Sequence, residues 1–148
     1  MRLICVGRHR YLSGHIRRFF EALGLHVVAT ESLDEALRLV PSVMPDVALV
    51  DYDLLASQPM SAWLADAAAR EVPLLAVSLA RRPEEMLLDR RVVVGSLYLP
   101  LLDAETALSV LRHAASRGGV AVPRGAVYPG RGARLTEPAP FHARPAEP

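Results

Sequence analysis

One short apolar run limits the folds open to this chain more than any other feature. Residues 47–50 read Val-Ala-Leu-Val; they follow Pro45 and Asp46 and lead directly into Asp51. Four apolar residues are too few for a helix, but they suit a strand buried on both faces of a parallel sheet. The carboxyl ends of such strands line the crevice where ligands bind, so Asp51 is the first candidate functional residue. Alternatively, Asp51 only caps a loop or a helix start.

Similar apolar runs recur along the chain and alternate with helical patterns. The runs predict further strands at residues 3–6, 26–29, 74–77 and 96–99. Apolar spacing and capping signals predict helices near residues 16–23, 33–40, 60–69, 83–93 and 104–115. This alternation predicts an α/β fold with a five-stranded parallel sheet in the order 2-1-3-4-5, a flavodoxin-like three-layer sandwich.

Several local predictions accompany this scheme. Residues 51–59 are expected to form a loop, and the next helix is expected to bury Trp63, Leu64 and Ala67. The valine run at 92–94 could belong to a helix or be extended, and Gly95 is expected to end it before the fifth strand.

Composition separates residues 1–117 from the rest of the chain. The sequence is 51% hydrophobic, which suffices for the core of one domain, but residues 118–148 hold six of the twelve prolines and little apolar periodicity. We expect this Pro/Gly/Arg-rich segment to be a disordered tail or linker. Cys5 is the only cysteine, so an internal disulfide and a Cys-rich zinc site are excluded.

Charge and hydropathy narrow the possible partners. The formal net charge of +1 argues against direct nucleic-acid binding. No apolar run reaches the roughly 20 residues of a membrane helix, and the first residues lack the pattern of a signal peptide. We therefore expect a cytoplasmic protein without a membrane partner.

Two strand ends carry polar residues in a pattern that a known family shares. Residues 45–51 read Pro-Asp-Val-Ala-Leu-Val-Asp, and residues 73–78 read Pro-Leu-Leu-Ala-Val-Ser. Together with the order of the elements over residues 1–117, these segments resemble the receiver domains of bacterial two-component response regulators. The resemblance implies that Asp51 is the equivalent of the phosphoacceptor aspartate and Ser78 the equivalent of the Ser/Thr switch residue.

The chain departs from this family where the phosphorylation chemistry resides. In the family, two acidic residues after the first strand hold Mg²⁺ together with the aspartate, and a lysine before a proline pairs with the phosphoryl group. Here these positions hold Gly7, Arg8 and Leu99, and all 17 basic residues are arginine. We expect Arg8 to pair with Asp51 or Asp53 in place of a metal ion, unless it is solvated. The predicted pocket around Asp51 consists of Gly7, Arg8, Asp53, Ser78 and Leu99.

Apolar residues crowd the last strand and the entry to the last helix. They are Leu97, Tyr98, Leu101 and Leu102. Leu101 and Leu102 are adjacent, so at least one of them is expected to be exposed. An exposed apolar side chain at this place favours an interface with a partner over ordinary packing at the sheet edge. By resemblance, receivers use this surface for partners and dimers. Tyr98 either has a switch-like role, as an aromatic of the fifth strand has in the family, or packs the sheet edge.

These observations favour a degenerate receiver domain, or pseudo-receiver, that works without phosphorylation and is not an enzyme. It would act in bacterial signalling as a module that binds a protein partner, or forms a homodimer, through the face of the fifth strand and last helix. Two alternatives stay open: a functional phosphoreceiver that accepts phosphate on Asp51, and a small-molecule sensor at the crevice near Gly7, Asp51 and Ser78. No metal or cofactor is expected.

Overall fold

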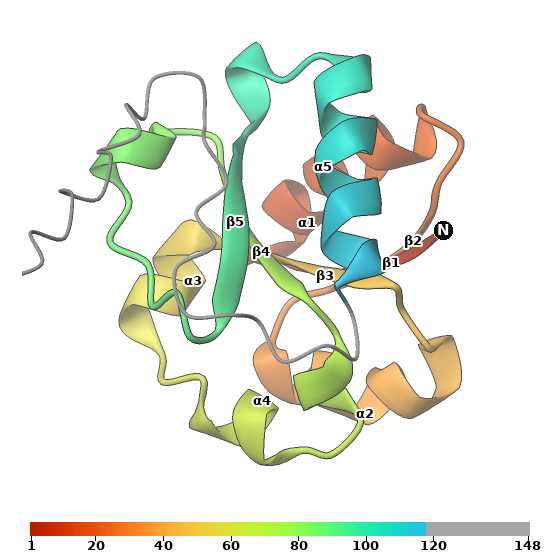
Figure 1. Cartoon of the computed structure of the whole chain (residues 1–148), viewed down its shortest axis with the longest axis vertical. Coiled ribbons are helices and arrows are strands. Elements are labelled where there is room, and N and C mark those ends of the chain that lie inside the picture. Colours follow the sequence, from red (N-terminus) through yellow and green to blue (C-terminus); the bar gives the residue numbers. More distant parts are fainter. Residues whose placement is uncertain (118–148) are drawn as a thin grey trace, which may run out of the picture.

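Five parallel strands form the centre of the molecule in the computed structural model, which describes residues 1–117 (Figure 1). The strands are β1 (Arg2–Val6), β2 (His26–Thr30), β3 (Val47–Asp51), β4 (Leu74–Ser78) and β5 (Val93–Tyr98). Their order in the sheet is β2-β1-β3-β4-β5, which confirms the predicted topology. The predicted tail at 118–148 lies outside the described residues.

Within residues 1–117, five α-helices and three short 3-10 helices connect or follow these strands. They are α1 (Arg10–Glu21), α2 (Leu33–Val43), α3 (Tyr52–Ser57), α4 (Ser61–Ala65), η1 (Ala69–Glu71), η2 (Pro83–Glu85), η3 (Leu99–Leu101) and α5 (Ala104–Ser116). The Ser32 hydroxyl accepts from the backbone N–H of Glu35 at 3.2 Å, so α2 has its predicted cap. Across residues 1–117 there is no helix with the length and apolar character needed to cross a membrane.

Two hydrophobic cores lie on opposite faces of the sheet. Alternate residues of β1 enter different cores: Leu3 and Cys5 pack with α1 and α5, whereas Ile4 and Val6 pack with α2, α3 and α4. Figure 1 shows the same division of the helices between the two faces. All residues of β3 and β4 are buried because helices cover both of their faces. The predicted three-layer sandwich is therefore correct.

The predicted loop at 51–59 is wrong, because α3 begins immediately after β3. The Asp51 side chain caps this helix, and its Oδ1 atom accepts from the backbone N–H of Asp53 at 3.3 Å. Asp51 thus has the capping role that the sequence left open. This cap lets the chain turn directly from strand to helix.

The predicted helix at 60–69 is interrupted and much shorter than expected. The Asp66 carboxylate accepts hydrogen bonds from the backbone N–H groups two and three residues later, which stabilises a turn between α4 and η1. Trp63 is 2% exposed, as predicted. Leu64 and Ala67, in contrast, are exposed, so their predicted burial is wrong: Leu64 lies on the outer side of the short α4, and Ala67 lies in the turn that follows it.

The segment before β5 also differs from the prediction. The expected helix at 83–93 is reduced to η2, and the valine run at 92–94 enters the strand, so its extended alternative is correct. Gly95 lies inside β5 and does not break it; the register opposite β4 shifts between Val93 and Gly95, which marks a β-bulge. The bulge accommodates one extra residue in β5, and the strand runs from Val93 to Tyr98, so it starts and ends earlier than the predicted segment 96–99.

Met44 ends α2 in a left-handed backbone conformation, with φ 47° and ψ 61°. A side chain in this conformation is strained, whereas glycine adopts it freely. We expect Met44→Gly to raise the free energy of unfolding by about 0.5–1 kcal/mol, after allowance for the larger entropy of glycine in the unfolded chain. Urea denaturation followed by circular dichroism measures this. Met44→Ala keeps the Cβ atom and should give no gain; an equal gain from both variants would contradict the explanation.

Candidate functional site

An ion pair joins the ends of β1 and β3. Val6 is opposite Val50 in the parallel ladder, so the residues that follow each strand emerge at the same edge of the sheet. Arg8 Nε donates to Asp51 Oδ2 at 2.6 Å, and Arg8 Nη2 lies 3.0 Å from Asp53 Oδ2. The side chain of Asp51 is 5% exposed, whereas that of Arg8 is 46% exposed. The structure thus places Arg8 against both carboxylates that the sequence offered as partners.

Both oxygens of Asp51 are engaged within the chain. Oδ2 accepts from Arg8, and Oδ1 accepts from the first turn of α3. Because the guanidinium is permanently charged, the buried carboxylate keeps a counter-ion at any ordinary pH. Burial of an unpaired carboxylate is costly, so the pair lets an aspartate occupy a position that is closed to solvent.

A second arginine, Arg81, lies beside the carboxylates of the site. Arg81 Nε lies 3.9 Å from Asp53 Oδ1. The Ser78 hydroxyl accepts from the backbone N–H groups of Ala80 at 3.2 Å and Arg81 at 2.8 Å, and this turn places Arg81 beside the site. Sequence reasoning missed Arg81. The signal available in the sequence was that Arg81 lies three residues after the end of β4, at the same edge of the sheet as Asp51 and Asp53.

Gly7 is packed against the first turn of α1. A Cβ atom at this position would lie 2.8 Å from the backbone nitrogen of Ser13 and 2.9 Å from its Cβ. Contacts this short do not occur for real Cβ atoms, so position 7 has no room for a side chain. This packing also limits the space for a small molecule next to Gly7.

The site does not fit Mg²⁺. This ion needs oxygen ligands at about 2.0–2.1 Å and is held by carboxylates and waters. Asp51 and Asp53 already pair with Arg8, and Gly7 has no room for another carboxylate. In the part of the chain that the structure describes, no three His, Cys, Asp or Glu side chains are grouped as metal ligands.

The predicted interaction surface is only partly at the surface. Leu97 is 2% exposed and belongs to the core beneath α1 and α5, so its assignment to an interface is wrong. Leu99, predicted for the pocket, is 6% exposed in the same core. Leu101 is 75% exposed, and Tyr98 and Leu102 are half-buried. These three residues remain candidates for contact with a partner.

Tyr52 connects the site to the segment before β5. It follows Asp51 directly, is 7% exposed, and its hydroxyl accepts from the backbone N–H of Leu87 at 3.0 Å. The Leu87 side chain itself is 90% exposed. Sequence patterns gave no signal for this contact, because the two residues are far apart in the chain.

Cys5 lies beneath the site and is expected to be unreactive. Burial, together with the nearby charge of Asp51, raises the pKa of its thiol to about 12. The thiolate is the reactive form, so native Cys5 should react with a disulfide reagent at pH 8 more slowly than the unfolded chain, by about a hundredfold or more. Absorbance of the released thiol measures both rates. Comparable rates with and without urea would contradict the burial of Cys5 in the structure.

Comparison with known proteins shows the fold but no close relative. No protein-family model matches the sequence, and no curated protein sequence matches it. Among solved structures, the chain is similar to the signal receiver domain of a modulated diguanylate cyclase from Desulfovibrio desulfuricans G20, with 25% identity, 79% of this chain and 94% of that chain covered, and a TM-score of 0.61.

Two other solved structures show the same similarity at lower identity. One is the receiver domain of a sensor histidine kinase from Pseudomonas aeruginosa PAO1, which has a magnesium ion coordinated in its active-site cleft (19% identity, 78% and 97% covered, TM-score 0.60). The other is a response regulator receiver domain protein from Clostridium thermocellum (15% identity, 78% and 94% covered, TM-score 0.60).

Proposed function

We propose that this chain, which has the fold of response-regulator receiver domains, works without phosphorylation as a protein-interaction module in signalling. The observation that carries the proposal is the 2.6 Å contact between Arg8 Nε and Asp51 Oδ2. The module has no catalytic residues and needs no metal. Its partner is another signalling protein or a second copy of the chain.

The ion pair removes the conditions for phosphoryl transfer. An acceptor carboxylate attacks phosphorus with one of its oxygens, and here Arg8 holds Oδ2 of Asp51 while the first turn of α3 holds Oδ1, which restricts the approach of a phosphoryl donor to either oxygen. Transfer also needs cations placed on the phosphoryl oxygens. A metal ion about 4 Å from the Arg8 guanidinium would be repelled by roughly 4 kcal/mol per unit charge at an effective dielectric constant of about 20. The sequence contains no lysine, so the lysine that pairs with the phosphoryl group in receiver domains has no counterpart here.

The interaction role is supported by exposed apolar side chains around β5. Leu87 precedes this strand and Leu101 follows it, with 90% and 75% of their surfaces exposed. Burying one leucine against a partner contributes about 1.5–3 kcal/mol, so these side chains would add to the affinity of a contact at this surface.

Treatment with acetyl phosphate and Mg²⁺, followed by intact mass measurement, tests the proposal. We expect the mass of the chain to stay unchanged. Arg8→Ala is the matched variant: if it gains one phosphoryl group while the natural chain does not, the ion pair is the cause of the block. A stoichiometric adduct on the natural chain that disappears in Asp51→Ala would establish the opposing function, a working phosphoreceiver.

A further inference from the structure

We propose that the exposed face of α1 binds single-stranded nucleic acid. This contact goes beyond the protein partner of the proposed function and lies on a different element. The net charge of +1 conceals an uneven distribution: residues 1–20 contain five arginines and no aspartate or glutamate, whereas residues 21–117 contain eight arginines and fourteen acidic residues. Basic residues that cluster on one face of a helix are an electrostatic footprint of nucleic-acid binding.

Two arginines on this face are available for phosphate groups. Arg10, Gly14 and Arg18 are four residues apart, so they lie on one side of α1 in consecutive turns. Arg10 and Arg18 are exposed, and neither forms an ion pair with another residue of the described range 1–117. A guanidinium group can donate two parallel N–H bonds to one phosphate, which fits it for contact with a nucleic-acid backbone.

Gly14 leaves the helix backbone open between these two arginines. Glycine is the least favourable residue after proline inside a helix, so its presence in α1 needs a reason. No atom lies within 4 Å of a Cβ built at this position, so packing does not require a glycine here. The other use of glycine is to let a ligand approach the backbone closely. Gly14 therefore gives a nucleic-acid strand room to lie against the helix between Arg10 and Arg18.

Tyr11 adds an aromatic surface to the same face. Its side chain is 74% exposed, and its ring is stacked with that of His9, with centroids 6.5 Å apart and an angle of 30° between the planes. The unstacked bases of a single strand can stack on exposed aromatic rings, whereas the bases of a duplex are already stacked on one another. The exposed ring thus favours a single strand as the ligand.

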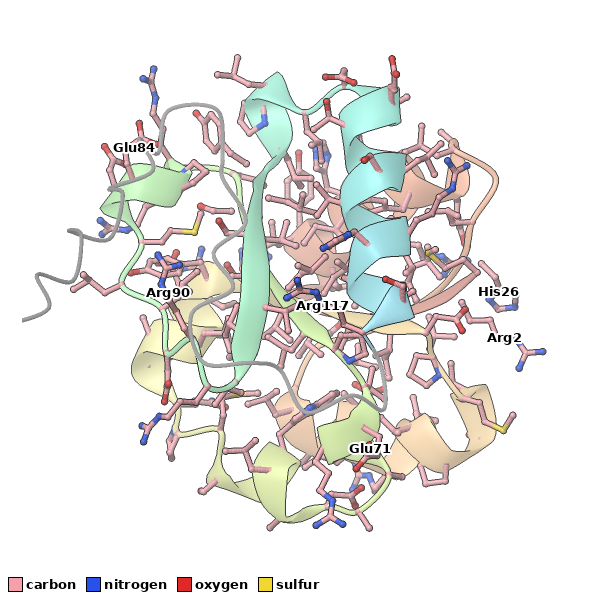
Figure 2. All side chains as sticks on the ribbon, in the orientation of Figure 1. Arg2, His26, Glu71, Glu84, Arg90 and Arg117 are labelled. Carbon is pink, nitrogen blue, oxygen red and sulfur yellow. The ribbon has the colours of Figure 1, made fainter. Side chains whose placement is uncertain are left out.

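The composition of this face favours nucleic acid over a second protein partner. Tyr11 is the only exposed large hydrophobic side chain of α1. Protein interfaces have an apolar core with few charges, whereas interfaces with nucleic acid are polar and positively charged. Glu21 of α1 pairs with Arg17 at 2.8 Å. Glu71 of η1 and Glu84 of η2 project into solvent away from α1 (Figure 2), so a polyanion is drawn to α1 rather than to these elements.

Fluorescence anisotropy of a labelled single-stranded oligonucleotide, titrated with the full chain at different salt concentrations, tests this inference. At about 20 mM salt we expect a dissociation constant on the order of 10⁻⁴ M, with a salt slope of about −1.4 for two phosphate contacts. Arg10→Gln should weaken binding roughly tenfold and halve the slope. Tyr11→Ala should weaken binding about fivefold or more and leave the slope unchanged. Arg38→Gln, which removes an exposed charge from α2, is the matched control and should change the constant less than about twofold.

Four results would overturn the inference. The natural chain could show no binding up to about 500 µM, a measurement that depends on no variant. Arg10→Gln or Tyr11→Ala could bind as tightly as the natural chain, which would place the contact on another basic segment, such as residues 118–148. Arg38→Gln could weaken binding as much as Arg10→Gln. A polyglutamate peptide of equal charge could displace the oligonucleotide as well as unlabelled oligonucleotide does, which would assign this face to an acidic protein. None of these results changes the phosphorylation measurement.

Discussion

Gly7→Ala is expected to lower the free energy of unfolding by about 2–3 kcal/mol, because the added Cβ atom overlaps the first turn of α1. The atoms in its way are the backbone nitrogen and the Cβ of Ser13, at 2.8 and 2.9 Å. They cannot yield easily, since the Ser13 N–H is bonded to the carbonyl oxygen of His9 at 3.1 Å. Chemical denaturation followed by circular dichroism gives the change.

Gly14→Ala is the matched control for this prediction. Gly14 lies inside α1, and no atom lies within 4 Å of a Cβ built at this position. Alanine is the better helix former, so this variant should raise the free energy of unfolding by about 1 kcal/mol. Equal effects of the two substitutions would show that α1 does not pack on Gly7 as described.

Arg8→Ala is expected to lower the free energy of unfolding by about 2 kcal/mol. The substitution leaves the Asp51 carboxylate without its counter-ion at a position that is 3% exposed. Loss of one partner of a fully buried pair costs about 3–5 kcal/mol, and the figure is reduced here because the Arg8 side chain is 46% exposed. Urea denaturation at neutral pH measures the loss.

A double-mutant cycle separates the ion pair from other effects of removing Arg8. Asp51→Ala removes the other partner, and the double variant should lose less stability than the two single losses together, with a coupling of about 1–2 kcal/mol. Strictly additive losses would mean that Arg8 does not stabilise Asp51. Arg8→Lys keeps the charge but loses the fork that reaches Asp51 and Asp53 together, so only part of the stability should remain.

The sheet was predictable because its inner strands are buried on both faces. The runs at 47–50 and 74–77 are apolar at every position, which marks parallel strands between two helix layers. The strand order was predicted because five strands alternating with five helices match the flavodoxin-like order 2-1-3-4-5, whereas right-handed crossovers alone do not fix the order. The contact of Arg8 with Asp51 was accessible by the same reasoning, since the ends of two adjacent parallel strands must meet.

The predictions of the helix at 60–69 and of the loop at 51–59 failed because in each segment one aspartate side chain overrides the local sequence pattern. Asp66 interrupts an Ala-rich stretch that favours a continuous helix, and Asp51 starts a helix in a segment that was expected to be a loop. Leu97 could not be assigned to the core from sequence, because apolar residues of an edge strand can point to either side. The contact between Tyr52 and Leu87 spans 35 residues, and no local pattern encodes it.

The burial of Trp63 gives the molecule an internal optical probe. It is the single tryptophan of the chain, it is 2% exposed, and it packs in the core that α2, α3 and α4 share with the sheet. Its emission should therefore be blue-shifted in the native state and should shift to longer wavelength when this half of the sandwich opens. The half beneath α1 and α5 contains no indole, so its loosening would change backbone signals before it changed the fluorescence.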